Sequence, residues 1–358
     1  MKIALATPIS LRSYGGAERK LVEAATILAE NGNDVCIYAL PFTHSGHRGD
    51  EAVTSLLEHP NLKYIEAKHC KIMADVAYVV YAPLIWRRFK FVCPSVAGLH
   101  SPLLFASKSS LVTFSIPWLA MKRYKSPRYI GSFWLSALMK RTDLARFSSV
   151  RILNPSFSIR HKFVYCIPDW VNSRVFEPLS RKGDVFVVFF GGRHHWEKGF
   201  DTFLQVATFL RKKGLKMRFM CTREGAGSVE GTGFLDDKRL ASAYSSSHLV
   251  VYPSRLDTFG GVILEAAACS TPVATTPLAA HRLGLPLLYA DHAEGFVRAT
   301  LKVYEMWKQN TGQYEELAQI HRKQAMKYDI RNIFPKFEKM LEQVEAGQQN
   351  LLSPETAR

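Results

Sequence analysis

The stretch PSRLDTFGGVILEAAACSTPVAT, residues 253–275, decides the fold of this chain. It follows an apolar run, residues 248–252, and passes through a glycine-bearing turn into an alanine-rich segment that favours a helix. A short apolar run that ends at Thr275 closes it. We therefore expect a strand, a turn, a buried helix and a second strand, the succession of elements found in α/β proteins.

Two carboxylates bracket the turn in this stretch. Asp257 and Glu265 lie eight residues apart, slightly more than two helical turns, so both can be aimed at one ligand above the helix start. The backbone N–H groups that follow Gly260 and Gly261 would offer an anion hydrogen-bond donors and the positive end of a helix dipole. A polyol that carries a phosphate fits these groups, and an ordinary strand-to-helix turn is the alternative.

Size and composition allow two domains. The chain has 358 residues, 47% of them hydrophobic, which is enough for two α/β domains with a core each. No apolar run approaches the roughly 18 residues of a membrane-spanning helix. The start, MKIALATP, is too short an apolar run for a signal sequence and reads as a first buried strand. The six cysteines form no CxxC pair, which fits reduced thiols in a cytoplasmic protein.

The net charge of +16 is unevenly distributed. Between Val76 and Thr142 there are ten Lys and Arg residues and no Asp or Glu, interleaved with aromatic residues such as Trp86 and Trp118. This mixture is typical of a surface that docks on anionic lipid, so we expect peripheral contact with the inner face of a membrane through residues 84–142. A generally basic protein with solvated lysines is the alternative. No nucleic-acid motif is recognised, so we expect no nucleic-acid partner.

Glycine turns follow two further strand-like runs. Gly15 and Gly16 come after the predicted strand 2–7 and open a helix to about residue 31, so the backbone there can approach a phosphate. The segment GGRHHWEKG, residues 191–199, follows a run that is apolar enough to be buried on both faces of a parallel sheet, residues 185–190.

Two cations lie beside the second of these turns. Arg193 offers a planar fork of donors and Lys198 a mobile point charge, a combination that suits a pyrophosphate group, whereas solvent-facing side chains are the alternative. Histidine 100 follows a predicted strand, residues 91–98, at the end where ligands of open α/β sheets gather. Other strands are expected at residues 35–40, 62–67, 76–81 and 216–221.

This layout resembles the GT-B glycosyltransferases and, within them, the large retaining family 4 (glycosyl transferases group 1), whose signature is a carboxylate, seven residues and a glutamate. The resemblance is strong over residues 185–280, fair over 1–40 and thin over 41–165. It implies an α/β, GT-B fold in which two Rossmann-like, doubly wound domains face a central cleft. The resemblance implies an acceptor-side domain at residues 1–165, a linker at 166–180 and a nucleotide-sugar-binding domain at 181–335. It also implies a C-terminal helix and tail at 336–358, which in this family often crosses back to the N-terminal domain.

The resemblance also implies roles for particular residues. It places the groups that carry the chemistry at His100, Arg193, Lys198 and Asp257. It places the donor-binding groups, which hold the diphosphate, base, ribose and sugar, at Gly15, Gly16, Gly192, Arg193, Lys198, Gly233, Phe234, Leu235, Asp257, Phe259, Gly260, Gly261, Val262 and Glu265. Glu265 would bind the ribose hydroxyls, and Asp257 the sugar hydroxyls.

The chain departs from the family pattern at two places. Asp257 stands where glutamate is commoner, and the missing methylene shortens the reach of the carboxylate toward a sugar. In the predicted linker, Asp169 and Trp170 replace the usual asparagine and glycine, which keeps the domain boundary but makes the loop bulkier.

The implied activity is the transfer of a sugar, with retention of configuration, from a UDP- or GDP-linked donor to a hydroxyl of a glycan, lipid-linked or other acceptor. No Asp-X-Asp motif is present, which agrees with a metal-independent reaction that needs no cofactor. The residues are compatible with glucose, mannose, galactose and N-acetylglucosamine. The alternatives are another GT-B chemistry such as a nucleotide-sugar epimerase, a non-catalytic partner subunit, and a basic lipid- or nucleic-acid-binding protein.

Overall fold

The computed structural model describes residues 1–12, 15–42, 58–83, 85–101, 140–157, 159–179 and 182–347. Most of the basic and aromatic segment expected to contact a membrane, and the C-terminal tail from residue 348, lie outside the described residues. The chain divides into two compact units, one made of Met1–Asp169 with Ile333–Arg358 and the other of Trp170–Asn332. We call them the first and the second unit.

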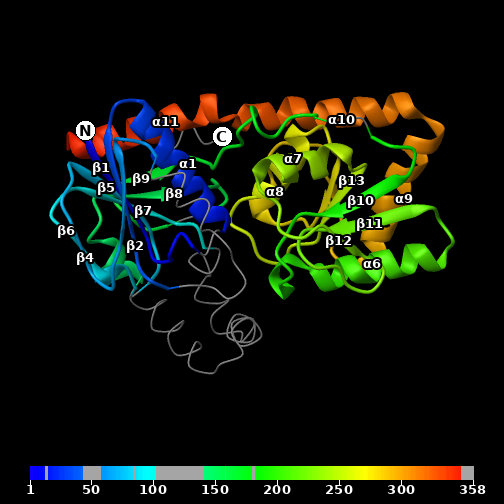
Figure 1. Ribbon diagram of the computed structural model, residues 1–358, viewed down its shortest axis with the longest axis horizontal. Coiled ribbons are helices and arrows are strands. Elements are labelled where there is room, and N and C mark those ends of the chain that lie inside the picture. Colours follow the sequence, from blue (N-terminus) through cyan, green and yellow to red (C-terminus); the bar gives the residue numbers. More distant parts are fainter. Residues whose placement is uncertain are drawn as a thin grey trace, which may run out of the picture. The chain divides into compact units, whose positions relative to one another are not determined.

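The first unit is built on a parallel sheet of seven strands in the order β3-β2-β1-β5-β7-β8-β9 (Figure 1). The strands are β1 (Lys2–Thr7), β2 (Asp34–Ala39), β3 (Leu62–Glu66), β5 (Val76–Val80), β7 (Ser95–Gly98), β8 (Ser149–Ile152) and β9 (Val164–Cys166). From β1 the chain proceeds to β2 and β3 on one side and returns to β5 on the other. This reversal between β1 and β5 makes the unit a doubly wound, Rossmann-like fold.

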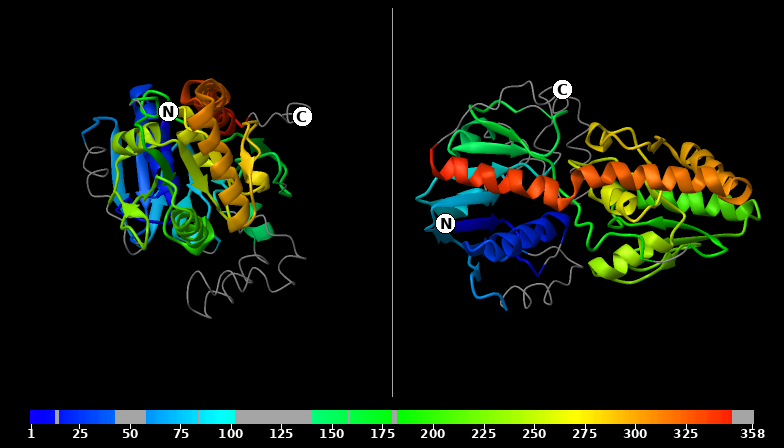
Figure 2. Two further views of the ribbon diagram at one scale, coloured as in Figure 1. Left: turned by 90° about the vertical axis from the view of Figure 1, so that its right-hand side faces the viewer. Right: turned by 90° about the horizontal axis from the view of Figure 1, so that it is seen from above.

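Helices cover one face of this sheet. Helix α1 (Gly16–Glu30) buries the predicted apolar stripe that includes Leu21, Ala25 and Leu28. Helix α11 (Ile330–Glu345) runs beside it over the same sheet (Figure 2), and Asn31 at the end of α1 donates a hydrogen bond of 3.0 Å to Glu338 of α11. The Phe337 ring packs edge-on against Tyr78 of β5, with 5.0 Å between centroids.

The predicted strand at residues 91–98 is wrong in its extent. The structure has two separate strands there, β6 (Phe89–Phe91), which pairs with β4 (Cys70–Ile72) in a small sheet, and β7 in the main sheet. Proline 94 lies between them and has no N–H group for a strand ladder, and Val92 is 78% exposed. The apolar composition of the whole segment hid this break.

The second unit contains a parallel sheet of six strands in the order β12-β11-β10-β13-β14-β15. They are β10 (Phe186–Phe190), β11 (Met217–Cys221), β12 (Glu230–Gly231), β13 (Leu249–Tyr252), β14 (Val273–Thr275) and β15 (Leu288–Tyr289). Its helices are α6 (Phe200–Lys212), α7 (Asp237–Ser246), α8 (Gly261–Ala268), α9 (Ala293–Gln309) and α10 (Thr311–Ala325). The strand order reverses between β10 and β13, so this unit is doubly wound as well.

Both faces of the second sheet are covered (Figure 1). Alternate residues of β10, Phe186 and Phe190, belong to a core formed with α6 and α9. Phe189 faces the other way and packs against Tyr244 of α7, with 5.6 Å between ring centroids. The strand is therefore buried on both sides, as its continuous apolar sequence predicted.

Among the described residues, no helix combines the length and the apolar character that crossing a bilayer requires. All six cysteines are free thiols. Cys166 is exposed, whereas Cys70, Cys221 and Cys269 are buried.

Candidate active site

The carboxyl edge of the second sheet gathers most of the predicted residues. Because every strand pair in this sheet is parallel, the loops that follow β10, β11, β13 and β14 all leave from one edge. Arg193 and Lys198 follow β10, and Asp257 follows β13, the two strands between which the strand order reverses. Ligands of doubly wound sheets bind at such a reversal.

Asp257 is surrounded by donors. Its Oδ2 accepts a hydrogen bond of 2.8 Å from the Tyr252 hydroxyl and lies 3.3 Å from Nε2 of His281. Its Oδ1 accepts the Thr258 N–H at 3.0 Å and lies 3.4 Å from Nζ of Lys198. The carboxylate side chain is 11% exposed, so these contacts are largely shielded from water.

Lys198 reaches Asp257 because the loops after β10 and β13 pack closely. Gly199 has φ +74°, and a Cβ there would collide with the carbonyl oxygen of Pro253, so only glycine fits between the two loops. The Arg255 N–H donates to the Glu197 carbonyl oxygen at 2.7 Å and links the same loops. The Lys198 ammonium also lies 5.5 Å from the centre of the Tyr252 ring, within the range of a cation–π contact.

These contacts set the protonation of two groups. Burial raises the pKa of Asp257, but the Lys198 charge and the His281 and Tyr252 hydrogen bonds outweigh it and hold the pKa well below its usual range. Burial and the neighbouring Asp257 charge raise the pKa of Tyr252 well above its usual value. At neutral pH the site thus contains an ionised carboxylate beside a neutral phenol.

Glu265 lies on α8, where it is 6% exposed. The Tyr244 hydroxyl is 3.5 Å from its Oε2, so Glu265 and Asp257 each have a tyrosine partner of their own. Helix α8 begins at Gly261 as predicted, without a side-chain cap at Gly260, and the Gly261 N–H donates to the Phe259 carbonyl oxygen at 2.9 Å. That N–H, which we expected to face an anion, is therefore engaged in the turn.

A second arginine stands near Arg193. Thr222 donates its hydroxyl to the Gly192 carbonyl oxygen at 3.0 Å, which ties together the residues that precede Arg193 and Arg223. Arg223 has φ +68°, a conformation that non-glycine residues rarely adopt, and its backbone pairs with Gly233. Burial first, and the Arg193 charge second, lower the pKa of Arg223. Two cations therefore share this part of the edge.

The loop predicted to meet the base follows Arg223. Gly233 has φ +75° and pairs with Arg223 through two backbone hydrogen bonds, of 2.6 and 2.9 Å. Phe234 next to it is 51% exposed, an unusual position for a large aromatic side chain. An exposed ring beside a cationic edge is suited to stacking on a planar ligand group.

His100 lies in the first unit, just beyond β7. Its Nε2 is 2.8 Å from the Tyr78 hydroxyl, and a Cβ at Gly98 would collide with that hydroxyl, so glycine at position 98 makes the contact possible. The buried Arg151 donates to the same Tyr78 oxygen at 3.1 Å, which leaves the Tyr78 hydrogen for the imidazole. Burial lowers the pKa of His100 to about 4, so the ring is neutral at physiological pH.

Asp169 supplies the counter-charge for Arg151. Arg151 is 2% exposed and donates to Asp169 Oδ1 at 2.8 Å and to the carbonyl oxygens of Ile167 and Pro168 at 2.9 and 2.8 Å. A neutral asparagine, the usual residue in the family that the sequence resembles, would leave this buried guanidinium without a charged partner. The aspartate at position 169 is thus explained by Arg151.

Gly15 and Gly16 begin α1 after β1, next to the strand reversal of the first sheet. Gly15 is the N-cap residue, with no side-chain cap. A Cβ built on Gly16 would meet no described atom within 4 Å, so the backbone there is open to close approach.

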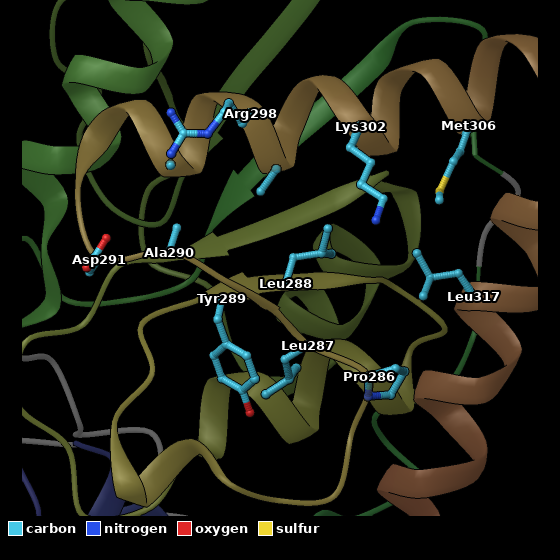
Figure 3. A pocket seen from close by; sticks show the side chains of 12 residues that line it. Pro286, Leu287, Leu288, Tyr289, Ala290, Asp291, Arg298, Lys302, Met306 and Leu317 are labelled. Carbon is cyan, nitrogen blue, oxygen red and sulfur yellow. The ribbon is translucent and has the colours of Figure 1, made fainter.

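A cavity of about 470 Å³ lies elsewhere in the second unit (Figure 3). It runs along the edge strand β15 and α9, and its lining includes Tyr289, Arg298 and Lys302. None of the predicted site residues lines it. The described residues also contain no cluster of three or more His, Cys, Asp and Glu side chains placed to hold a metal ion.

Sequence reasoning missed four residues of the site, namely Arg223, Tyr244, Tyr252 and His281. Tyr252 ends an apolar strand and Tyr244 lies on an ordinary amphipathic helix, so neither carries a signal of its own. His281 is 24 residues from Asp257 and lies in the short helix η4 (Ala279–His281). Arg223 alone could have been noticed, as a cation in a glycine-rich loop that follows a strand.

Comparison with known proteins identifies the class of fold first. The chain is similar to the crystal structure of Anabaena Alr3699/HepE in complex with UDP and glucose, with a TM-score of 0.69 and 15% identity over 96% of this chain and 99% of that one. The chain therefore has the mixed α/β fold of two Rossmann-like domains that is called GT-B, and the predicted fold class is confirmed.

Sequence comparison then points to particular relatives. Residues 185–306 match the family described as "Glycosyl transferases group 1". D-inositol 3-phosphate glycosyltransferase of Paenarthrobacter aurescens is 32% identical over 30% of this chain and 34% of its own length. Alpha-D-kanosaminyltransferase of Streptomyces kanamyceticus is 28% identical over 48% of this chain and 49% of its own length. The chain thus spans about half or less of the length of these curated relatives.

Proposed function

We propose that this protein is a glycosyltransferase that moves a sugar from a nucleotide-sugar donor to an acceptor hydroxyl. The observation that carries the proposal is the placement of Lys198 and Asp257 at the strand reversal of the second sheet, within the segment that matches the group 1 family. The donor nucleotide would bind at this edge, with Arg193, Arg223 and Lys198 around its diphosphate. The neighbour HepE, whose structure holds UDP and glucose, supports a UDP-linked donor, and a GDP-linked donor is the alternative.

The reaction asks the protein mainly to stabilise a leaving group. As the bond between sugar and diphosphate breaks, negative charge grows on the departing nucleoside diphosphate. Lys198 and the two arginines bring positive charge to the edge where that group would lie. We propose on this basis that the reaction needs no metal ion and that Glu265, buried in the middle of α8, binds the ribose hydroxyls.

We further propose that configuration is retained through front-face substitution, in which the leaving phosphate accepts the proton of the acceptor hydroxyl. His100 is a poor general base in this setting, because its pKa of about 4 leaves it little affinity for a proton at neutral pH. As a neutral ring it would serve to orient a sugar or an acceptor hydroxyl by hydrogen bonding.

The acceptor that we propose is anionic or carried by a lipid, and the protein would contact the cytoplasmic face of a membrane peripherally. The relative whose name contains inositol 3-phosphate supports an anionic acceptor, and the basic and aromatic composition of residues 84–142 supports the membrane contact. Flotation with liposomes tests the second point, since binding that ignores the anionic lipid content would contradict it.

A thermal-shift screen against UDP, GDP and their sugars tests the donor site. A ligand that binds only the folded state raises its stability, so we expect one nucleotide series to raise the Tm, and Glu265→Ala to abolish the effect. Incubation of that nucleotide sugar with candidate acceptors, with the anomeric proton of the product read by NMR, then tests transfer and retention. Absence of stabilisation by any nucleotide would point to a non-catalytic partner subunit. Conversion of the donor in the absence of an acceptor would point to an epimerase.

A further inference from the structure

We propose that Tyr78 and Asp169 are positioning residues that hold the neutral His100 ring with its hydrogen on Nδ1, so that Nδ1 is the donor atom of the ring. This inference rests on the proposed function, because it concerns the histidine to which the family resemblance gives a part in that reaction. It adds two residues of the first unit to the site and states which ring nitrogen carries the hydrogen.

The contact between Tyr78 and His100 is built into the sheet of the first unit. Tyr78 lies on β5 and Arg151 on β8, and β7 runs between these two strands. Gly98, the register partner of Arg151 on β7, has no side chain, so the end of the Tyr78 ring lies over it. The Tyr78 hydroxyl is therefore 2.8 Å from His100 Nε2 and 3.1 Å from Arg151 Nη1.

The Tyr78 hydroxyl favours one tautomer of the imidazole. Burial raises the pKa of Tyr78, so the phenol keeps its hydrogen at neutral pH. Among the residues that the structure describes, this hydroxyl has two hydrogen-bond partners, and Arg151 can only donate, so the phenol hydrogen goes to His100 Nε2. A hydrogen on Nε2 would leave the buried phenol hydrogen without an acceptor, which corresponds to a ratio of about ten to one between the tautomers.

The charge of Asp169 favours the same tautomer from the other nitrogen. Its Oδ1 accepts from Arg151 Nη2 at 2.8 Å, whereas its Oδ2 lies 3.9 Å from His100 Nδ1. This distance is too long for a hydrogen bond, but the negative charge attracts a hydrogen on Nδ1 and repels a lone pair there. The side chains of His100 and Asp169 are 10% and 14% exposed, so water screens the effect only in part.

These two contacts determine what the ring can offer to a substrate. The His100 ring is neutral, since burial lowers its pKa to about 4, and it therefore carries one hydrogen. Its Nε2 is engaged by Tyr78, so a substrate hydroxyl that contacts the ring does so at Nδ1, as an acceptor. Asp169 thus has a second role besides its pairing with Arg151, and a neutral asparagine would lack the charge that this role needs.

Nitrogen NMR of the histidine rings tests the tautomer without any substrate. Long-range proton–nitrogen correlation spectra of histidine-labelled protein distinguish the two neutral tautomers, and the His100 signals are identified by their loss in His100→Asn. We expect the wild type to carry the hydrogen on Nδ1. Tyr78→Phe should move the ratio toward Nε2 by about ten-fold, and Asp169→Asn by a smaller factor. A wild-type ring with its hydrogen on Nε2 would overturn the proposal, whatever the folding of the variants.

Tyr81 provides a matched control for Tyr78. It directly follows the same strand, and its buried hydroxyl donates to Asp143 at 3.3 Å. Tyr81→Phe removes a comparable buried hydrogen bond but should leave the tautomer of His100 unchanged. Equal changes of the tautomer ratio in Tyr78→Phe and Tyr81→Phe would show a general loosening of the unit and would overturn the role of Tyr78.

Two substitutions of His100 then test the donor atom during transfer. Asparagine places its amide nitrogen near the position of Nδ1, and glutamine places its own near that of Nε2. With the donor that the thermal-shift screen selects, we expect the kcat of His100→Asn to exceed that of His100→Gln about ten-fold, with the Tm of each variant measured to verify folding. Equal activities of the two folded variants would overturn the assignment of Nδ1. A wild type that transfers no sugar would refute the proposed function, and the NMR spectra would still decide the tautomer.

Discussion

Replacing Asp169 with asparagine tests the buried ion pair of the first unit. Arg151 is 2% exposed. Burial lowers the pKa of its guanidinium, but Tyr78 and Asp169 outweigh that effect and raise the pKa above its usual value. The guanidinium therefore stays ionised when a neutral asparagine replaces Asp169. Removing one member of a buried pair costs about 3–5 kcal/mol. The asparagine oxygen can still accept from Nη2, and the carbonyl oxygens of Ile167 and Pro168 remain, so we expect about 3 kcal/mol, the lower end of that range.

In a unit of this size, that loss lowers the Tm by roughly 6–12 °C. Scanning calorimetry would resolve the change in the transition of the first unit, and that of the second unit, Trp170–Asn332, serves as the internal control. Adding Arg151→Met to Asp169→Asn should restore most of the loss, because methionine keeps an apolar contact with the Phe337 ring, over which Arg151 now lies at 5.1 Å. A shift below about 2 °C for the single variant would mean that the pair is screened by solvent, and our explanation of Asp169 would be refuted.

Three further predictions concern stability and binding. Burial lowers the pKa values of His248 and His321 to about 4, so the folded chain binds fewer protons than the unfolded chain between pH 6.5 and 4. Each histidine should therefore remove up to about 3 kcal/mol of stability as the pH falls through that window. A urea midpoint that does not change with pH in this window would contradict the prediction. Gly98→Ala should lower the free energy of unfolding by about 1–3 kcal/mol, because the new methyl group collides with the Tyr78 hydroxyl. Adding Tyr78→Phe to Gly98→Ala should restore part of that stability. Equal melting temperatures of Gly98→Ala and the wild type would contradict this, since they would mean that the strand shifts without cost. Arg223→Gly should change the free energy of unfolding by less than about 1 kcal/mol, because relief of the strained φ offsets the added conformational entropy of the unfolded chain. The same substitution should weaken the binding of a nucleoside diphosphate about ten-fold. An unchanged affinity in calorimetry would show that Arg223 does not belong to the site.

Much of the second unit could be predicted from the sequence, because its elements are long or strongly apolar. The helix after Gly260 and the buried strand that ends at Phe190 were both visible in the pattern of apolar residues. That Lys198 and Asp257 belong to one site was implied by the family resemblance, and the structure gives the physical reason, because the loops of a parallel sheet leave from a common edge.

The partners of these residues could not be predicted. Tyr252 ends the strand that precedes Asp257, but the apolar run around it does not indicate that its hydroxyl turns toward the carboxylate. His281 meets Asp257 because β13 and β14 are neighbours in the sheet, and nothing in the spacing of 24 residues between the two indicates it. Similarly, Asp169 was visible as a departure from a family pattern, but its reason, Arg151, lies on another strand. The break at Pro94 was missed because the segment was judged by its apolar composition alone.

The first unit is discontinuous in the sequence, and this has a consequence for the order in which the protein can mature on the ribosome. Residues 170–332 emerge as one uninterrupted piece and can fold as soon as they are released. The sheet of the first unit emerges earlier but must wait for α11, whose Phe337 covers Tyr78 and Arg151. Until α11 has been synthesised, the Arg151 guanidinium and the Tyr78 ring, which are buried in the complete fold, are accessible to solvent and to chaperones. The half of the protein that is synthesised first is therefore completed last.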